Sequence, residues 1–447
     1  MNSTLLAALI VLGSIVPSPH PVRADGESHP RDRHVIICID GVGFATFEEM
    51  RAEGKFRQFH EPARMIATFP SLTDISLTAI LAPAGARPAR GYEDAWFDPS
   101  SQRVRGGLVD RFRQDRFVRG TFRELFDYHP SAIKSGLAFG APPASTYIEA
   151  ATDVAMAGRK ARQSNDPVFF AYVAGSDTLA HVGGERMLRS LLARLDATAT
   201  SLLREGQGHT TVTIFSDHGN EFRSLHRVSL KGALRRAGLA PDSRLRSPAS
   251  VVSPSFGLIG CVVLYTAERN EPVAAHAVAN VKGVDFAAYE HDGVVTVVGP
   301  TGTATIERRE DRFRYRMVSG DPLWVAPALG ELRARGAVDA DGFANESDWF
   351  AATCESARPD AVRRVYEGLT RNVATPANVL VALADGWYAG NPLLDVFAFM
   401  QATHGNAGRG ASLGFVATTD RDLPRYLAAG DVWQAIGAPR IARSPAP

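Results

Sequence analysis

Cysteine is scarce in this chain. Three cysteines occur among 447 residues, and no Cys-x-x-Cys pair is present. This excludes a disulfide framework and a zinc-finger site built on thiolates. Cys38 lies in an apolar run and is expected to be a small buried side chain. Cys261 and Cys354 remain open to pairing if the compartment is oxidising.

An excess of charge of either sign is also missing. Lys and Arg number 49, Asp and Glu number 48, and the formal net charge is +1. This balance gives no basic surface for nucleic acid and no acidic tail. Hydrophobic residues make up 45% of the chain, which is ordinary for globular proteins. A chain of this length can bury a large core without disulfides.

The first 24 residues have the pattern of a secretory signal peptide. Leu5 to Val16 is uncharged and apolar, and Val22-Arg23-Ala24 places suitable residues for cleavage before Asp25. The stretch is too short to span a bilayer, and no other segment is apolar enough, so no membrane span is expected in the mature chain. The protein is therefore expected to be secreted or periplasmic, with an uncleaved anchor as the alternative.

Strand and helix patterns alternate along most of the mature chain. Apolar strand patterns cover residues 33–40, 63–68, 168–174, 210–216, 378–384 and 411–418. Helical spacing covers 71–81 and 184–203. Such alternation predicts an α/β fold with a mostly parallel sheet between helices on both faces, a three-layer αβα sandwich.

Residues 283–320 break this alternation. Short apolar runs at 294–298, 303–307 and 312–317, joined by turn residues, predict a small antiparallel meander. Helical segments are expected to follow near 325–336 and 358–370. We therefore predict a catalytic core in two parts, 25–280 and 376–447, with a small α+β cap inserted at 281–375.

Side chains able to bind metal stand where the predicted strands end. In open α/β sheets the carboxyl ends of the strands carry the site. Taken alone, each of these groups also fits a turn, a helix cap or a surface histidine. The candidates are Asp40-Gly41, Asp177-Thr-Leu-Ala-His181, Ser216-Asp217-His218-Gly219 and Thr403-His404-Gly405.

Thr68-Phe69-Pro70 offers a hydroxyl at the end of the second strand. Thr68 precedes a predicted helix, whose positive amino terminus would favour an ionised hydroxyl. A bound metal would lower the pKa of that hydroxyl further. The alternative is a threonine, or Ser71, that caps the helix.

Along the chain these groups follow the order Asp40, Thr68, Asp177/His181, Asp217/His218 and His404. With its motifs in this order, the sequence resembles the alkaline phosphatase superfamily, and most closely its nucleotide pyrophosphatase/phosphodiesterase branch, the type I phosphodiesterases. The resemblance covers about residues 33–225 and 378–420, and its most specific parts are Ser-Asp-His-Gly and Thr-Phe-Pro. It implies an alkaline-phosphatase-like fold and a metal-dependent phosphodiesterase or nucleotide pyrophosphatase.

The resemblance also implies two zinc sites and a nucleophile. One zinc would be held by Asp40, Asp217 and His218 beside Thr68, which would bind it and attack phosphorus. The other would be held by Asp177, His181 and His404. Six oxygen and nitrogen ligands without a thiolate suit Zn²⁺, and also Mn²⁺. Two such ions, about 4 Å apart, can clamp the attacking and leaving oxygens of an in-line displacement.

One segment departs from the family pattern. The family carries an Asn that hydrogen-bonds a nonbridging phosphoryl oxygen, and no Asn stands in Gly91–Pro99. Asp94 or Ala95 would take its place, and we name Asp94 as a candidate substrate-binding residue. Aromatic residues of the same segment offer either a face for substrate or core packing, and core packing is favoured. They are Tyr92, Trp96 and Phe97.

Several functions remain open at this point. A sulfatase is excluded because the chain has no Cys-x-Pro-x-Arg motif. A phosphomonoesterase or phosphonate hydrolase would use the same metal site, and a catalytically inactive secreted metal-bound binding protein is an alternative of another class. The expected partner is a small-molecule phosphate ester: a nucleotide, a lipid head group or a phosphonate. The sequence does not choose among them, nor does it give the oligomeric state.

Overall fold

The computed structural model describes residues 32–93, 95–106, 121–130, 141–254, 257–267, 269–392 and 400–438. The chain divides into Met1–Arg31 and Asp32–Pro447, and every described residue belongs to the second part. The predicted signal peptide, residues 1–24, lies outside the described residues. Among the described residues, no helix combines the length and apolarity that crossing a bilayer requires.

A six-stranded sheet forms the core that the sequence predicts. β1 lies between β5 and β6 and is parallel to both, whereas β19 runs antiparallel to β6 and β2. The sheet is therefore mostly parallel, with one reversed strand. Its strands, in spatial order, are β20 (Tyr426–Ala428), β2 (Ala63–Ile66), β19 (Leu413–Thr418), β6 (Thr210–Phe215), β1 (Arg33–Ile39) and β5 (Val168–Val173).

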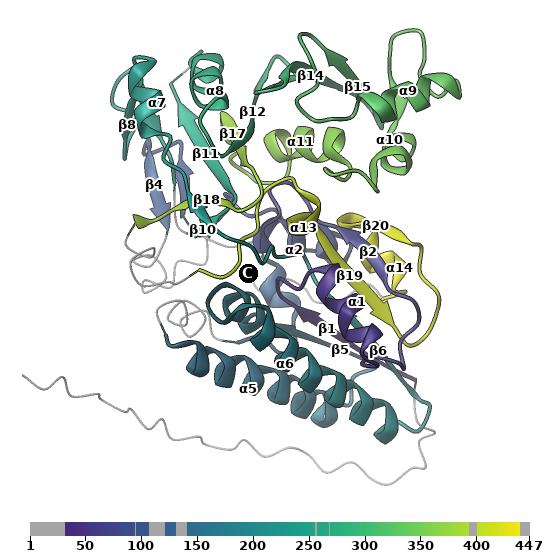
Figure 1. Ribbon diagram of the computed structural model, residues 1–447. Coiled ribbons are helices and arrows are strands. Elements are labelled where there is room, and N and C mark those ends of the chain that lie inside the picture. The colour runs from purple at the N-terminus through teal and green to yellow at the C-terminus, as the bar shows by residue number, and fades with distance from the viewer. Residues whose placement is uncertain are drawn as a thin grey trace, which may run out of the picture. The chain divides into compact units, whose positions relative to one another are not determined.

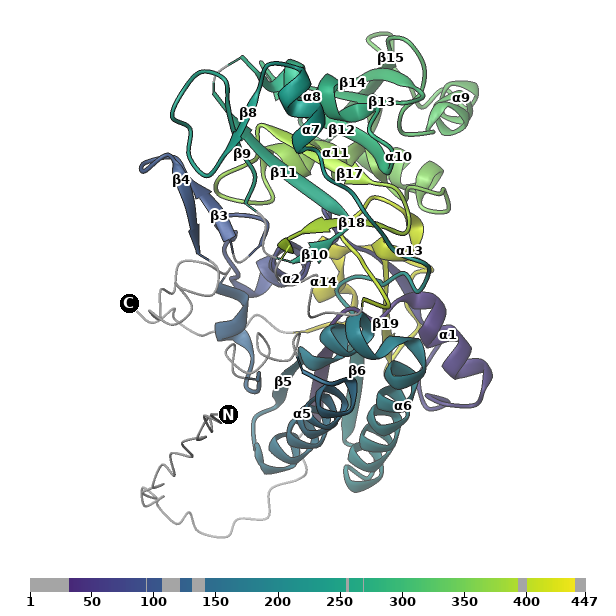
Figure 2. The same cartoon turned by 60° about the vertical axis from the view of Figure 1, so that its left-hand side comes forward.

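Alternate residues of β1 enter two different hydrophobic clusters. Val35 and Ile37 face one cluster, and Ile36 and Cys38 face the other, as the period of two in a strand requires. The first cluster is completed by α1 (Phe44–Ala52), α5 (Pro143–Gln163) and α6 (Gly175–Glu205), and Figure 1 and Figure 2 show α5 and α6 side by side. The second is completed by α2 (Thr73–Leu81), η1 (Ala82–Ala84), η2 (Thr121–Leu125), η4 (Ala429–Asp431) and α14 (Val432–Ala435). The three-layer α/β arrangement is thereby confirmed.

A second sheet of nine strands holds the predicted meander. β12 to β15 pair antiparallel in sequence order, as expected. The strand predicted at 378–384 forms as β17, but it pairs with β11 and β12 in this sheet and not in the six-stranded one, which corrects that expectation. In spatial order the strands are β16 (Ala344–Asn345), β15 (Arg312–Met317), β14 (Gly302–Arg309), β13 (Val294–Gly299), β12 (Val284–His291), β17 (Val379–Leu383), β11 (Cys261–Thr266), β9 (Ser250–Val252) and β8 (Ala240–Asp242).

Helices cover both faces of the nine-stranded sheet. On one side lie α7 (Lys231–Arg236) and α8 (Glu271–Ala279), and on the other α9 (Ala326–Ala334), α10 (Glu346–Thr353) and α11 (Ala361–Thr370). The remaining strands form two small sheets. One holds, in spatial order, β10 (Leu258–Ile259), β18 (Trp387–Gly390) and β7 (His226–Arg227), and the other is the hairpin of β3 (Ala95–Asp98) and β4 (Arg103–Gly106). The limits 281–375 for an inserted cap remain a prediction.

The three cysteines are all free and buried. Cys38 packs in the core as expected. Cys261 and Cys354 belong to different hydrophobic clusters and are not joined. The fold of the described residues is therefore held by packing and hydrogen bonds without a disulfide.

His34 gives the core a testable dependence on pH. Burial lowers the pKa of His34 to about 4 from 6.5, which the charge of Asp420 opposes, and its Nε2 lies 2.7 Å from Thr213 Oγ1. Between those pH values the unfolded chain binds more protons than the native one. The contribution of His34 to the free energy of unfolding, about 3 kcal/mol, is therefore fully present above about pH 6.5. It is lost as the pH falls toward about 4.

We expect His34→Gln to flatten this dependence. Urea unfolding at about pH 7.5 and about pH 4.5 measures it, because the loss of unfolding free energy on acidification should be smaller in the variant than in the wild type. His291→Gln, at a side chain that is 70% exposed, is the matched control. Equal pH dependence in His34→Gln and the wild type would contradict the assignment.

Candidate metal centre

The predicted ligands gather at one edge of the six-stranded sheet. Asp40 directly follows β1, and Asp217 and His218 follow β6. Asp177 and His181 lie in the first turns of α6, which begins just after β5. Because β1, β5 and β6 are parallel neighbours, their carboxyl ends meet at this edge.

His404 reaches the same edge from the other direction. It precedes α13 (Arg409–Ser412) and β19, and β19 is antiparallel to β6, so the amino end of β19 lies where β6 ends. Backbone hydrogen bonds between Glu221 and Thr403 tie the segment of His218 to that of His404. The reversed strand is what brings the last predicted ligand to the site.

Asp40, Asp217 and His218 form the first group. Their ligand atoms lie within 4.8 Å of one another, and His218 Nε2 is 3.5 Å from Asp40 Oδ1 and 3.5 Å from Asp217 Oδ2. All three side chains are buried. Asp217 Oδ2 has no hydrogen-bond partner among the described residues. A buried, uncompensated carboxylate oxygen is costly, and a cation is one way to compensate it.

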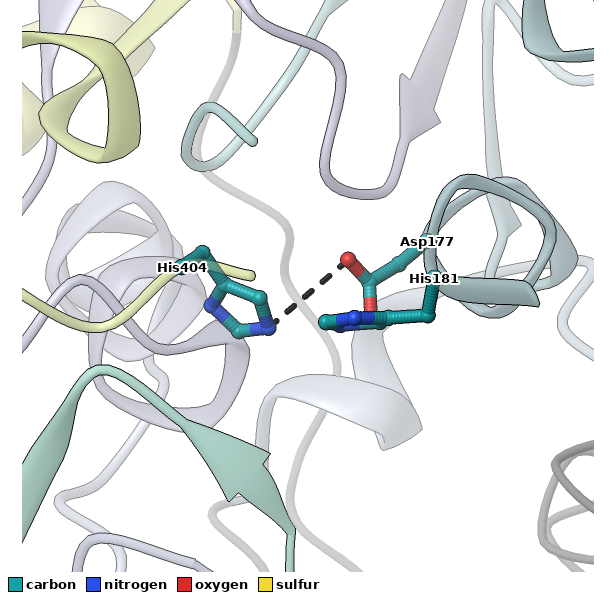
Figure 3. Close-up of side chains that lie close together, drawn as sticks. All are labelled: Asp177, His181 and His404. Atoms are coloured by element: carbon teal, nitrogen blue, oxygen red, sulfur yellow. Dashed lines mark ion pairs between the residues drawn. The ribbon is translucent and has the colours of Figure 1, made fainter. Parts of the chain in front are cut away.

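Asp177, His181 and His404 form the second group. Asp177 Oδ2 lies 3.3 Å from His181 Nε2, and Asp177 Oδ1 lies 3.7 Å from His404 Nε2 (Figure 3). The i, i+4 spacing on α6 places Asp177 and His181 on one face, as predicted. The rings of His404 and His218 stack with centroids 4.0 Å apart, so the two groups are neighbours.

Backbone carbonyls orient all three histidines. In each ring Nδ1 lies within hydrogen-bond distance of a carbonyl oxygen, which fixes the tautomer and turns Nε2 toward the carboxylates. This is the arrangement found around metal-binding histidines. The pairs are His181 with Ala402 at 2.8 Å, His218 with Gly219 at 3.0 Å, and His404 with Ser71 at 2.8 Å.

Like charges and burial set the ionisation of the carboxylates. Burial and the charges of neighbouring carboxylates raise the pKa of Asp40 well above its usual value, and burial also raises the pKa of Asp217. Burial opposes ionisation of Asp177, but His181 and His404 hold its pKa well below the usual value. Burial lowers the pKa of His404 to about 3, so this ring is neutral near pH 7, the form that binds metal.

This donor set fits two divalent cations. It holds three carboxylates and three imidazoles without a thiolate, all buried except Asp177, which is partly buried. Oxygen and nitrogen ligands of this kind suit Zn²⁺ and Mn²⁺ and do not distinguish them. The residues present would hold one ion in each group.

Three further side-chain or backbone donors support the ligands. Tyr172 donates to Asp40 Oδ2 at 2.5 Å, Asn220 Nδ2 donates to Asp177 Oδ1 at 2.8 Å, and the amide of Gly41 donates to Asp217 Oδ1 at 3.2 Å. Sequence reasoning did not find Tyr172 or Asn220 in these roles. Asn220 follows the Ser-Asp-His-Gly motif directly, and that position was the available signal.

Gly41 must be a glycine for steric reasons. Its φ is +66°, in the left-handed region. A Cβ there would lie 2.3 Å from Asp177 Oδ1, a carboxylate of the second group. The glycine of the Asp40-Gly41 pair therefore lets the two metal groups approach each other, beyond making a turn.

The structure distinguishes two threonine hydroxyls. Thr68 Oγ1 lies 3.2 Å from the carbonyl of Pro70 and 3.0 Å from Ser76 Oγ, so its hydrogen bonds stay within its own segment. Thr73, the first residue of α2, donates to Asp40 Oδ1 at 3.2 Å and lies 3.2 Å from His218 Nε2. Among the described contacts, it is the Thr73 hydroxyl that touches the first group, and Thr68 as the nucleophile stays a prediction.

The remaining predicted substrate residue, Asp94, lies outside the described residues. Its neighbours Tyr92, Trp96 and Phe97 are buried, in agreement with the favoured core interpretation. Tyr92 donates to the carbonyl of Gly368 at 2.6 Å, and Phe97 stacks on Tyr265. These rings are engaged in packing.

Several solved structures are similar to this chain. Murine ectonucleotide pyrophosphatase/phosphodiesterase 5 shares 10% identity at a TM-score of 0.45, over 90% of this chain and 94% of that one. Its human counterpart shares 10% identity at a TM-score of 0.47, over 90% of this chain and 93% of that one. Phosphonoacetate hydrolase from Sinorhizobium meliloti 1021, in complex with phosphonoformate, shares 12% identity at a TM-score of 0.49, over 92% of this chain and 96% of that one.

No protein-family model matches the chain, and no curated protein matches it.

We expect the protein to bind two divalent ions per chain and Asp177→Asn to bind one. Elemental analysis after dialysis against Zn²⁺ counts them. At free ion about 1,000 times the Kd, each ion should stabilise the fold by about 4 kcal/mol, so chelation should lower the Tm. His60→Ala, at a histidine paired with Asp422, is the control. Retention of both ions by Asp177→Asn would contradict the second group as a metal site.

Proposed function

We propose that this chain is a metal-dependent hydrolase of phosphate esters, acting as a phosphodiesterase or nucleotide pyrophosphatase with a threonine nucleophile. The observation that supports this most directly is the pair of adjacent Asp/His groups with the Thr73 hydroxyl on the first of them. Two adjacent cation sites and one aligned hydroxyl suit in-line displacement at phosphorus.

We favour Thr73 over Thr68 as the nucleophile. Thr73 begins a nine-residue helix, and the positive amino terminus of that helix favours an ionised hydroxyl there. Its Oγ1 donates to Asp40 Oδ1, so Asp40 can orient the hydroxyl. Thr68 stays the candidate that the Thr-Phe-Pro motif favours, and it is retained as the alternative.

The chain's own residues would divide the reaction between them. Divalent ions, Zn²⁺ by preference or Mn²⁺, would supply Lewis-acid stabilisation of charge on the phosphoryl oxygens. Thr73 Oγ1, its proton released to solvent, would form a bond to phosphorus as the bond between phosphorus and the leaving ester oxygen breaks. Water would then cleave the phosphoryl-threonine bond and regenerate the hydroxyl. Asp40, Tyr172 and Ser71 would hold the reacting side chains and His404 in place.

The substrate class proposed is a small phosphate ester: a nucleotide, a lipid head-group ester or a phosphonate. The same groups would serve a phosphomonoesterase, because ligands alone do not distinguish a monoester from a diester. The N-terminal 24 residues remain proposed as a signal peptide, which would place the mature protein outside the cytoplasm.

Activity on two chromogenic esters tests the function. We expect the zinc-loaded protein to hydrolyse bis-p-nitrophenyl phosphate with kcat/KM at least about tenfold above that for p-nitrophenyl phosphate, a difference of roughly 1.4 kcal/mol in the transition state. A higher kcat/KM for the monoester would indicate that the protein is a phosphatase and not a phosphodiesterase. Absence of turnover on both esters and on a phosphonate panel, with two ions bound, would favour the metal-bound binding protein.

Two alanine variants separate the threonines. Thr73→Ala should lower kcat by at least about 1,000-fold, roughly 4 kcal/mol, while metal content stays at two ions. Thr68→Ala should lower kcat by less than about tenfold, because only local hydrogen bonds are lost. The reverse order of effects would restore Thr68 as the nucleophile. Equal metal content in both variants, measured in the same samples, makes the comparison valid.

A further inference from the structure

The Thr68–Leu72 segment leads directly to Thr73 and is here called the nucleophile loop. It packs into the hydrophobic core of the nine-stranded sheet. Phe69 and Leu72 are buried in the hydrophobic cluster that contains Phe286 of β12, and the rings of Phe69 and Phe286 have centroids 5.6 Å apart. The loop connects β2 of the six-stranded sheet to α2. Its apolar side chains therefore belong to one sheet while its backbone leads to the metal centre of the other.

Arg364 of α11 holds the start of this loop. Its Nη2 donates to the carbonyl of Thr68 at 3.0 Å, to Ser71 Oγ at 3.2 Å and to Ser412 Oγ at 2.7 Å. Its Nη1 donates to the carbonyl of Pro359 at 2.9 Å. Arg364 is 3% exposed, and burial lowers its pKa to about 10, which leaves it charged near pH 7.

The next turn of α11 continues the contact. Gly368, four residues on and therefore on the same face, lies against the carbonyl of Phe69. A Cβ at Gly368 would stand 2.5 Å from that oxygen, so a larger residue would displace the loop. Just beyond the end of the helix, Asn372 Nδ2 donates to the same carbonyl at 3.2 Å.

The opposite side of the loop supports the metal centre. The carbonyl of Ser71 lies 2.8 Å from His404 Nδ1, and Ser71 Oγ donates to the carbonyl of Asn406 at 2.9 Å. The loop then leads directly to Thr73. A single residue, Ser71, thus stands between the Arg364 guanidinium and a ligand of the second metal group.

We propose that α11 positions the active centre through Arg364 and Gly368, which fix the nucleophile loop and, through it, both His404 and Thr73. Arg364 is a positioning residue in this proposal. The expected effect on turnover rests on the proposed hydrolase function, whereas the expected effect on ion binding does not.

The geometry requires a guanidinium specifically. The two arms of the fork reach different partners: Nη2 reaches the Thr68 carbonyl and two hydroxyls, and Nη1 reaches the Pro359 carbonyl. Lysine offers a single ammonium on a flexible stem and can satisfy only part of this set. Arg364→Lys should therefore restore part of what Arg364→Met loses.

Titration of the apo protein with Zn²⁺ and steady-state kinetics form the test. In Arg364→Met and in Gly368→Ala we expect the affinity for one of the two ions to fall about 10- to 100-fold, as when the partners that orient a metal ligand are removed. The other ion should bind as in the wild type. kcat should fall by a similar factor, with KM within about twofold of the wild type. The ion affinity and kcat of Arg364→Lys should lie between those of Arg364→Met and those of the wild type.

Matched controls come from the same layer of helices. Arg363→Met removes an arginine that pairs with Asp360 and Glu346 and does not reach the loop in the contacts described. Gly330→Ala changes a glycine of α9 where an added Cβ meets nothing within 4 Å. Both controls should keep two ions at wild-type affinity and wild-type kcat.

Two results would overturn the proposal. One is wild-type affinity for both ions and unchanged kcat in folded Arg364→Met and Gly368→Ala. The other is an equal loss in the Arg363→Met control, which would indicate general destabilisation. If Arg364→Met does not fold, Gly368→Ala and Arg364→Lys decide by the same criteria. Loss of ion affinity in a protein with no turnover on any ester would support the positioning role and reject the hydrolase.

Discussion

The structure depends on one electrostatic constraint: three carboxylates, two of them buried and one partly buried, lie together at one sheet edge. Asp40, Asp177 and Asp217 lie in one small region, each within reach of a histidine. Burial removes the water that would stabilise their charges, and mutual repulsion raises the pKa of Asp40 further. His181 and His404 favour the ionised form of Asp177, whereas Asp40 and Asp217 lack such compensation, and a bound cation would supply it.

The sheet topology explains how six distant residues meet this constraint. Parallel β1, β5 and β6 end at one edge, and the reversed β19 delivers His404 to it. The second sheet contributes differently, because it buries the apolar side chains of the loop that precedes α2. One sheet thus supplies the ligands, and the other fixes the loop that orients one of them.

The sequence predicted the part of the site that depends on local order. Each carboxylate or histidine follows a strand pattern or keeps a helical spacing, so Asp40, Asp177 and Asp217 could be found one segment at a time. Thr73 could not, because its contacts with Asp40 and His218 join residues 33 and 145 positions apart. The strand at 378–384 was also found correctly but assigned to the wrong sheet. Strand patterns identify a strand and not its partners.

The six residues from Thr68 to Thr73 are attached differently at their two ends. At one end, the carbonyl of Thr68 accepts a hydrogen bond from Arg364; at the other, the hydroxyl of Thr73 contacts the first metal group. The chain between them is buried and hydrogen-bonded at Ser71, so little conformational freedom is left to lose when substrate binds. In the proposed hydrolase, a hydroxyl held in this way would be oriented before the reaction, and orientation of the reacting groups is a large part of what a catalytic site contributes.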